Sequence, residues 1–294
     1  MRRYVAMWFM GSMVVTCLAG AVTAQHPQEG QLIMALDATK VVDVILDLRK
    51  FLYSDQSLKG QVAFGKDEHK IIDGALEQLD IGKPEGAVQL LQVSEEKGNL
   101  KHNPNYWLLL AYAKHQLGDI DGARQSVRQL LSIPKLETRL MLSAWSVLRE
   151  LGQTPENEEG KRVRGVVVEI DYRDRVIIVA GYEDGTSRLL FGEGGGILGE
   201  KEDFPIESLV AAKELIRSTQ SLIGKVPLEG MRQLPKQNHV RFALLTTAGI
   251  YAAEESIDKL EKRRSPLSPA WTAANQLLGI LLDFIQARKK SRLP

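Results

Sequence analysis

The sequence predicts two folded domains, an all-α domain followed by an α+β domain with an antiparallel sheet. Up to Gly152, apolar residues recur at the three- and four-residue spacing of amphipathic helices. Beyond Lys161, β-branched residues become frequent and alternate with period two, which indicates strands. The 294 residues are 44% hydrophobic and 26% charged, which excludes a disordered chain and a multi-pass membrane protein. We therefore expect a signal peptide over 1–24, a helical domain over 25–156 and an α+β domain over 157–294.

Residues 1–24 have the pattern of a secretory signal peptide. Arg2 and Arg3 precede an apolar stretch from Val5 to Val22, and small residues lead to a cleavage site after Ala24. The single cysteine of the chain lies in this segment, so the mature protein would fold without disulfides. Such a chain fits export to a bacterial periplasm or to the extracellular space.

Two alternatives to cleavage stay open. The apolar stretch nearly reaches the roughly 20 residues that span a bilayer, so the segment could remain as an anchor. Cys17 could also be lipidated, although Thr16 stands where a lipobox has a small residue.

Helical spacing continues along the first half of the chain after the linker 25–29. Residues 31–52 predict one or two amphipathic helices, and residues 67–152 contain five further helical patterns. The polar, acidic stretch from Gln153 to Lys161 then predicts a linker.

An internal repeat lies within residues 67–152. Ile71, Gly74-Ala75, Gly82, Ala87 and Leu91 are matched 36 residues later by Trp107, Leu110-Ala111, Gly118, Ala123 and Val127. Small residues at these positions let paired helices approach closely, and each glycine falls where the first helix of a pair must end.

With this pattern the chain resembles the tetratricopeptide repeat family, whose units are helical hairpins. It departs from the family in having Lys114 where Tyr is preferred and a period of 36 in place of 34. The stretch from Thr138 to Leu151 would be a capping helix. An ordinary helical bundle with accidental periodicity is the alternative.

The resemblance implies a concave groove that binds a protein or peptide partner. Its expected lining residues are Asn105, Leu108, Tyr112, His115, Gln116, Met141, Trp145 and Arg149. The alternative is that these side chains pack against the chain's own N-terminal helix, residues 31–52.

The second half predicts a repeated order of hairpin, loop and helix. The expected strands are 163–170, 175–181, 187–191, 239–246 and 250–254, and the expected helices are 206–223, 257–262 and 269–288. Asp-Gly at Asp184-Gly185 between apolar runs is a hairpin signal. We expect a ββα duplication with one antiparallel sheet and its helices on one face; hairpins in two separate sheets would contradict it.

No motif in the sequence indicates catalysis, a cofactor or a metal. Gly194 to Gly199 satisfies G-x-G-x-x-G, but it follows an antiparallel meander, which argues against a dinucleotide site. The five histidines are scattered without metal-ligand spacing, and no nucleophile elbow is present. The formal net charge of +1 gives no reason to expect nucleic acid as a partner.

The sequence thus predicts an exported, non-enzymatic scaffold that acts in the cell envelope through protein–protein contact. Its α+β domain would offer a second docking surface or pair two copies. Membrane contact is expected only if residues 1–24 are not cleaved. The alternative is a C-terminal domain that binds a small ligand or hydrolyses envelope material near His239 and the glycine-rich loop.

Overall fold

A computed structural model describes residues 49–54, 56–63, 70–95, 99–172, 175–192, 196–197, 203–229 and 234–290. The expected signal peptide and residues 31–48 of the expected N-terminal helices lie outside these ranges. No helix in the described ranges has both the length and the apolar character needed to cross a membrane.

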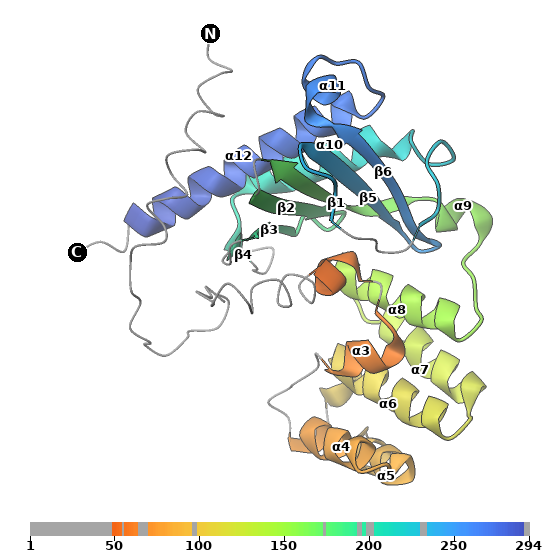
Figure 1. Cartoon of the computed structure of the whole chain (residues 1–294). Helices are drawn as coiled ribbons and strands as arrows, with labels where there is room; N and C mark the ends of the chain where they lie inside the picture. Colours follow the sequence, from red (N-terminus) through yellow and green to blue (C-terminus); the bar gives the residue numbers. More distant parts are fainter. Residues whose placement is uncertain are drawn as a thin grey trace.

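The first half consists of helices that stack away from the sheet (Figure 1). α4 (Lys70–Asp80) pairs with α5 (Pro84–Glu95), and α6 (Pro104–Gln116) pairs with α7 (Ile120–Leu131). The 3-10 helix η1 (Asn99–His102) joins the two hairpins, and α8 (Thr138–Glu150) follows them. The short helix α3 (Leu58–Ala63) lies beside α6 and α8.

Three of these helices end in the same way. Gly82, Gly118 and Gly152 follow α4, α6 and α8 with φ of 71°, 78° and 81°, a conformation that glycine adopts without strain. After each glycine, the next N–H donates to a carbonyl five residues back, for example from Asp119 to Lys114 at 2.9 Å. The prediction that Gly82 and Gly118 end their helices is confirmed, and Gly152 ends α8 with the same C-cap.

Small residues allow the helices to approach one another, as their spacing predicts. The alanines at 75, 87, 111, 123 and 144 are all fully buried. Asp119 caps α7 as expected, since its Oδ1 accepts a hydrogen bond from the N–H of Gly122 at 2.9 Å.

The second half contains one antiparallel sheet in the order β4-β3-β2-β1-β5-β6. Its strands are β1 (Val163–Tyr172), β2 (Arg175–Tyr182), β3 (Ser187–Phe191), β4 (Gly196–Ile197), β5 (His239–Thr246) and β6 (Gly249–Ser256). Both hairpins lie in this sheet, so the expectation of a single sheet is confirmed.

The arrangement also has the approximate two-fold symmetry that a ββα duplication would produce. β1 and β5 lie next to each other at the centre and run antiparallel, and β2 and β6 flank them. Each central strand forms a hairpin with its outer neighbour, in which Tyr172 pairs with Arg175 and Thr246 pairs with Gly249.

The helices of this half cover one face of the sheet (Figure 1). α10 (Ile206–Gln220) and α12 (Ser268–Lys290) contact each other and bury the alanine and leucine side chains between them and the strands. α11 (Ile257–Glu261) adds Ile257 and Leu260 to the same core. α10 is three residues shorter than expected, because the chain turns at Ser221.

The opposite face of the sheet is also buried, and here the expectation of period-two alternation was wrong. Residues 166–168 are all fully buried, as are Val179 and Ala180. Strands that are covered on both faces form continuous apolar runs and do not alternate with polar residues. The second cover comes from Leu142 of α8 and from residues 49–54.

α8 is therefore both the last helix of the stack and a layer on the sheet (Figure 1). At its N-terminus, Asp184 from the β2–β3 turn accepts a hydrogen bond from the N–H of Thr138 at 2.7 Å. Near its C-terminus, Arg149 Nη1 donates to the carbonyl of Thr247 in the β5–β6 turn at 2.6 Å. The short helix α9 (Asn157–Gly160) ends just before β1, and the two halves meet in one hydrophobic cluster that contains Leu142 of α8 and Val167 of β1.

Candidate functional site

Two hollows stand out among the described residues, and both lie in the helical half. The smaller one, of about 80 Å³, lies where the concave groove was expected. The larger one, of about 480 Å³, lies on the other side of α6, between α5 and α7.

On the side of the helices where the groove was expected, α3 of the chain's own N-terminal segment packs against α6 and α8. Leu58 and Val62 of α3 belong to the helical core and are 1% and 6% exposed. The Oε2 atom of Glu150, at the end of α8, accepts a hydrogen bond from the N–H of Leu58 at 2.8 Å and so holds the start of α3. The segment that fills this side is therefore 49–63, of which only 49–52 belongs to the helix that the sequence predicted.

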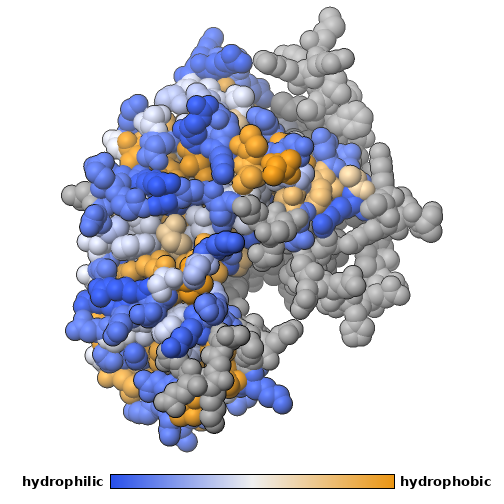
Figure 2. Space-filling model, turned by 180° about the vertical axis from the view of Figure 1, so that it is seen from behind, coloured by the Kyte–Doolittle hydropathy of each residue, from blue (hydrophilic) through white to orange (hydrophobic). Residues whose placement is uncertain are grey.

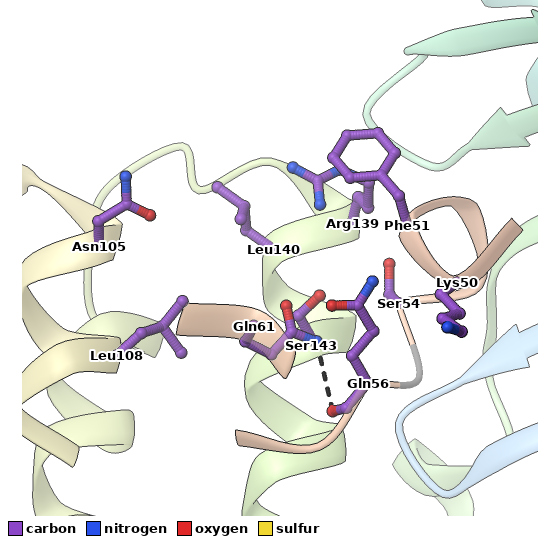
Figure 3. Close-up of a pocket in the computed structure, with 10 residues that line it drawn as sticks. All are labelled: Lys50, Phe51, Ser54, Gln56, Gln61, Asn105, Leu108, Arg139, Leu140 and Ser143. Atoms are coloured by element: carbon purple, nitrogen blue, oxygen red, sulfur yellow. Dashed lines mark hydrogen bonds between the residues drawn. The ribbon is translucent and has the colours of Figure 1, made fainter. Parts of the chain in front are cut away.

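The small hollow lies between this segment and the helices α6 and α8 (Figure 3). Phe51 lies against the Arg139 guanidinium, whose carbon is 3.8 Å from the centre of the ring. The buried hydroxyls of Ser54 and Ser143 have no hydrogen-bond partner among the described residues. A volume of this size accommodates about two or three water molecules, which would satisfy these hydroxyls. It is too small for a large aromatic side chain of a partner.

The structure separates the eight residues expected to line the groove. Asn105 and Leu108 line the small hollow, while Tyr112 and Trp145 are half-buried against the helical core. Met141 packs against the core beneath the sheet, and Arg149 bonds to the sheet turn. His115 and Gln116, at the end of α6, are half-buried and exposed.

The larger hollow is an open groove with α6 as its floor. Trp107 and Leu110 of α6 form that floor, with Ser126 of α7 beside them, and all three residues are buried. Gln92 of α5 stands on one side, and Gln125 and Gln129 of α7 stand on the other. The remaining lining residues are Lys101, His102, Lys114, Ser132, Ile133 and Pro134. Its volume is in the range of pockets that hold a small molecule or a short segment of chain.

This groove is not among the sites that the sequence predicts. The repeat pattern identified Trp107 and Leu110 as core positions, and they are, but they also form the bottom of an exposed channel. The available signal was the polar face of α7, where Gln125, Gln129 and Ser132 recur at helical spacing.

At the alternative site near His239, a carboxylate residue, Asp171, is the strand partner of His239. Neither of the two hollows described above lies there. In the strand register His239 lies between Asp171 and Ser256, on the sheet face that residues 49–54 partly cover. Its Nδ1 atom is 3.0 Å from the carbonyl oxygen of Gln237. Most of the glycine-rich loop lies outside the described residues. Within the described residues no cluster of three His, Cys, Asp or Glu side chains could hold a metal ion.

Three buried ionisable groups with shifted pKa values, Arg49, Tyr53 and Tyr182, lie where residues 49–54 cover the sheet. Burial alone would lower the pKa of Arg49, but the hydrogen bonds and the charge of Glu169 outweigh it, so the pKa is raised. Burial and the nearby Glu169 charge raise the pKa of Tyr53 well above its usual value. Burial likewise raises the pKa of Tyr182, whose hydroxyl donates to the carbonyl of Leu52 at 2.7 Å.

Comparison of the chain with protein-family models, with curated proteins and with solved structures finds no match in any of the three. The site must therefore be interpreted from its own geometry.

Proposed function

We propose that this chain is an exported, non-enzymatic scaffold protein whose helical stack binds a protein partner. The groove between α5 and α7 carries the proposal, because it is an open hollow of about 480 Å³ with a buried floor and polar walls. α8 fixes the stack to the sheet at both of its ends, so a bound partner would be held in a set orientation to the α+β half.

A relationship to tetratricopeptide repeats is part of this proposal. It is supported by two successive helical hairpins that are followed by a single helix. It is also supported by the positive-φ glycine that ends each of α4, α6 and α8. The buried alanines at matched positions of both hairpins support it further. The partner surface differs from the one that the resemblance implies, because residues 49–63 occupy the concave side.

The groove is a better candidate for the docking site than the exposed apolar side chains are. On the face shown in Figure 2, apolar side chains form separate patches with hydrophilic residues around them. The two most exposed large apolar side chains among the described residues are Ile206 and Val210 on α10. Scattered apolar residues of this kind are normal on a folded protein and need no partner.

Export is proposed on the pattern of residues 1–24, with the envelope as the place of action. The mass of the protein purified from an envelope fraction tests it. Cleavage after Ala24 predicts a mature chain that begins at Gln25. A mass that includes residues 1–24 in full would indicate an anchor, and an acylated Cys17 would indicate a lipoprotein.

Docking is tested by capture from envelope extract with three immobilised proteins. Gln129→Trp places a large ring in the groove from its exposed rim and leaves the floor intact. Lys213→Trp makes a matched change on the exposed side of α10. We expect wild type and Lys213→Trp to capture the same partner and Gln129→Trp to lose it. Identical captured sets from all three proteins would show that the groove is not the docking site.

A further inference from the structure

The segment 49–63 is attached to the rest of the molecule in two different ways. Residues 49–54 are fixed to the sheet by the buried ion pair of Arg49 with Glu169. The hydroxyl of Tyr182 also donates to the carbonyl of Leu52 at 2.7 Å. Separating the ion pair would leave a buried charge without its partner, so this half of the segment resists displacement. The other half, α3, lies on α6 and α8 through apolar contacts and a hydrogen bond to the end of α8.

The contacts of α3 define what fits the surface of α6 and α8. Leu58 and Val62 belong to the helical core, and side chains four positions apart lie on one face of a helix. The Glu150 carboxylate accepts from the N–H of Leu58 at 2.8 Å, and a negative charge is favourable at the first turn of a helix. The surface therefore fits the N-terminal turns of an amphipathic helix.

Two features weaken the hold of α3. Gly60 lies inside the helix, where glycine lowers the intrinsic helix stability. The hollow of about 80 Å³ separates part of the segment from α6 and α8 (Figure 3). The hydroxyls of Ser54 and Ser143 in its wall have no hydrogen-bond partner among the described residues, so water takes the place of protein contacts there. α3 should therefore open at a lower free energy than residues 49–54.

We propose that α3 is an internal ligand that an amphipathic helix of a partner protein displaces. The incoming helix would place two apolar side chains, four positions apart, in the sites of Leu58 and Val62, with its first turn at Glu150. A helix without an interior glycine would be more stable than α3, which offsets the advantage that α3 has from its tether. Residues 49–54 stay on the sheet, so α3 rebinds when the partner leaves. This surface is separate from the groove between α5 and α7, and the proposal does not depend on that groove.

Hydrogen exchange of the wild-type chain tests the opening without any substitution. The N–H of Gln61 in α3 donates to the carbonyl of Ser57 at 2.9 Å, so it exchanges only when α3 opens. We expect this amide to exchange faster than the amides in the middle of α6, because local opening needs less free energy than opening of the core.

Fluorescence anisotropy with a labelled helical peptide tests the displacement. The peptide has the α3 sequence with Gly60→Ala, extended by Ala and Lys to about 15 residues so that it forms a helix. The control peptide also carries Leu58→Ser/Val62→Ser. In the full chain, Leu58→Ser/Val62→Ser is the released variant. Its matched control is Ile206→Ser/Val210→Ser, which changes an exposed apolar pair at the same spacing on α10.

We expect the released variant to bind the first peptide about ten-fold or more tightly than wild type does, because the tethered competitor is gone. The α10 variant should bind it as wild type does. The control peptide should bind none of the three proteins, since it lacks the apolar face. Thermal unfolding of both variants verifies that they fold.

Each measurement has a result that would overturn the proposal. If Gln61 exchanges only together with α6, α3 is part of the core and no partner replaces it. The same follows if the released variant fails to fold or binds the peptide no more tightly than wild type. If the control peptide binds equally well, the surface does not select an apolar helix face. A wild-type dimer in light scattering that the released variant loses would assign the surface to α3 of a second copy.

Discussion

Arg49 and Glu169 form a bidentate ion pair that is closed to solvent, with Nε to Oε1 at 2.6 Å and Nη2 to Oε2 at 3.0 Å. The two side chains are 1% and 0% exposed. The pair joins the helical residues 49–53 to the central strand β1 across 120 positions of sequence. It therefore determines where the N-terminal segment lies on the sheet.

Arg49→Met should lower the free energy of unfolding by about 3–5 kcal/mol, because it leaves the Glu169 carboxylate buried without its partner. The double variant Arg49→Met/Glu169→Leu should recover most of the loss, since no isolated charge remains. Urea unfolding measures both. Arg217→Met, which breaks the exposed pair with Glu214, is the control and should change little. Equal losses from Arg49→Met and Arg217→Met would contradict a structural role for the buried pair.

Asp184→Ala should weaken the attachment of α8 to the sheet. The carboxylate accepts from the N–H of Thr138 and from the N–H and hydroxyl of Thr186, so it caps the helix and also orders its own turn. The loss of a cap of this kind costs about 1 kcal/mol. Hydrogen exchange should become faster in the first turn of α8.

Asp119→Ala is the comparison for this cap, because Asp119 caps α7 from within its own hairpin. It should speed exchange in α7 and leave α8 unchanged. If both variants affected α7 and α8 alike, the cap from the sheet would have no separate role.

Tyr53 and Tyr182 should resist ionisation in an alkaline titration of the folded protein. Burial raises both pKa values above the ordinary value of 10.0, so the folded state keeps these protons when the unfolded state releases them. Their stabilising contribution is therefore complete below about pH 10 and is lost as the pH rises further. Phenolate absorbance and stability measured against pH test this, and Tyr53→Phe should make the alkaline loss of stability shallower. An unchanged slope in that variant would argue against the raised pKa.

Gly185→Ala should destabilise more than Gly118→Ala. Both glycines have positive φ, which costs a side-chain-bearing residue about 1 kcal/mol or somewhat more. A Cβ at 118 would meet nothing within 4 Å, whereas a Cβ at 185 would clash with Leu209 Cδ1. Urea unfolding should thus show the backbone cost alone at 118 and an added steric cost at 185; similar losses at both positions would mean that Leu209 moves away freely.

Local patterns in the sequence predicted the secondary structure well. The strands at 163–170, 187–191 and 239–246 agree with the structure to within a few residues, because hairpin turns and apolar runs are local signals. Gly82, Gly118 and Asp119 were placed correctly for the same reason, since caps depend on adjacent backbone.

The joining of the two halves could not be predicted in this way. The contact between Arg49 and Glu169 has no local periodicity, and the sequence shows Asp184 as a turn residue, not as the cap of a helix 46 positions earlier. One signal was present in the consecutive valines 166–168, which are typical of a strand buried on both faces. The groove between α5 and α7 was missed because it exists only between helices that have already packed.

Because residues 49–54 pack on the sheet, they can reach their final position only after the sheet has been synthesised. These residues leave the ribosome well before β1, and the apolar side chains of Leu52 and Tyr53 have no sheet to cover until then. The hairpins α4–α5 and α6–α7 contain their own contacts and can form during synthesis, while the N-terminal segment must wait. A chain that stalls or is cut before Glu169 would therefore expose this segment, and chaperones or proteases of the compartment would meet it first.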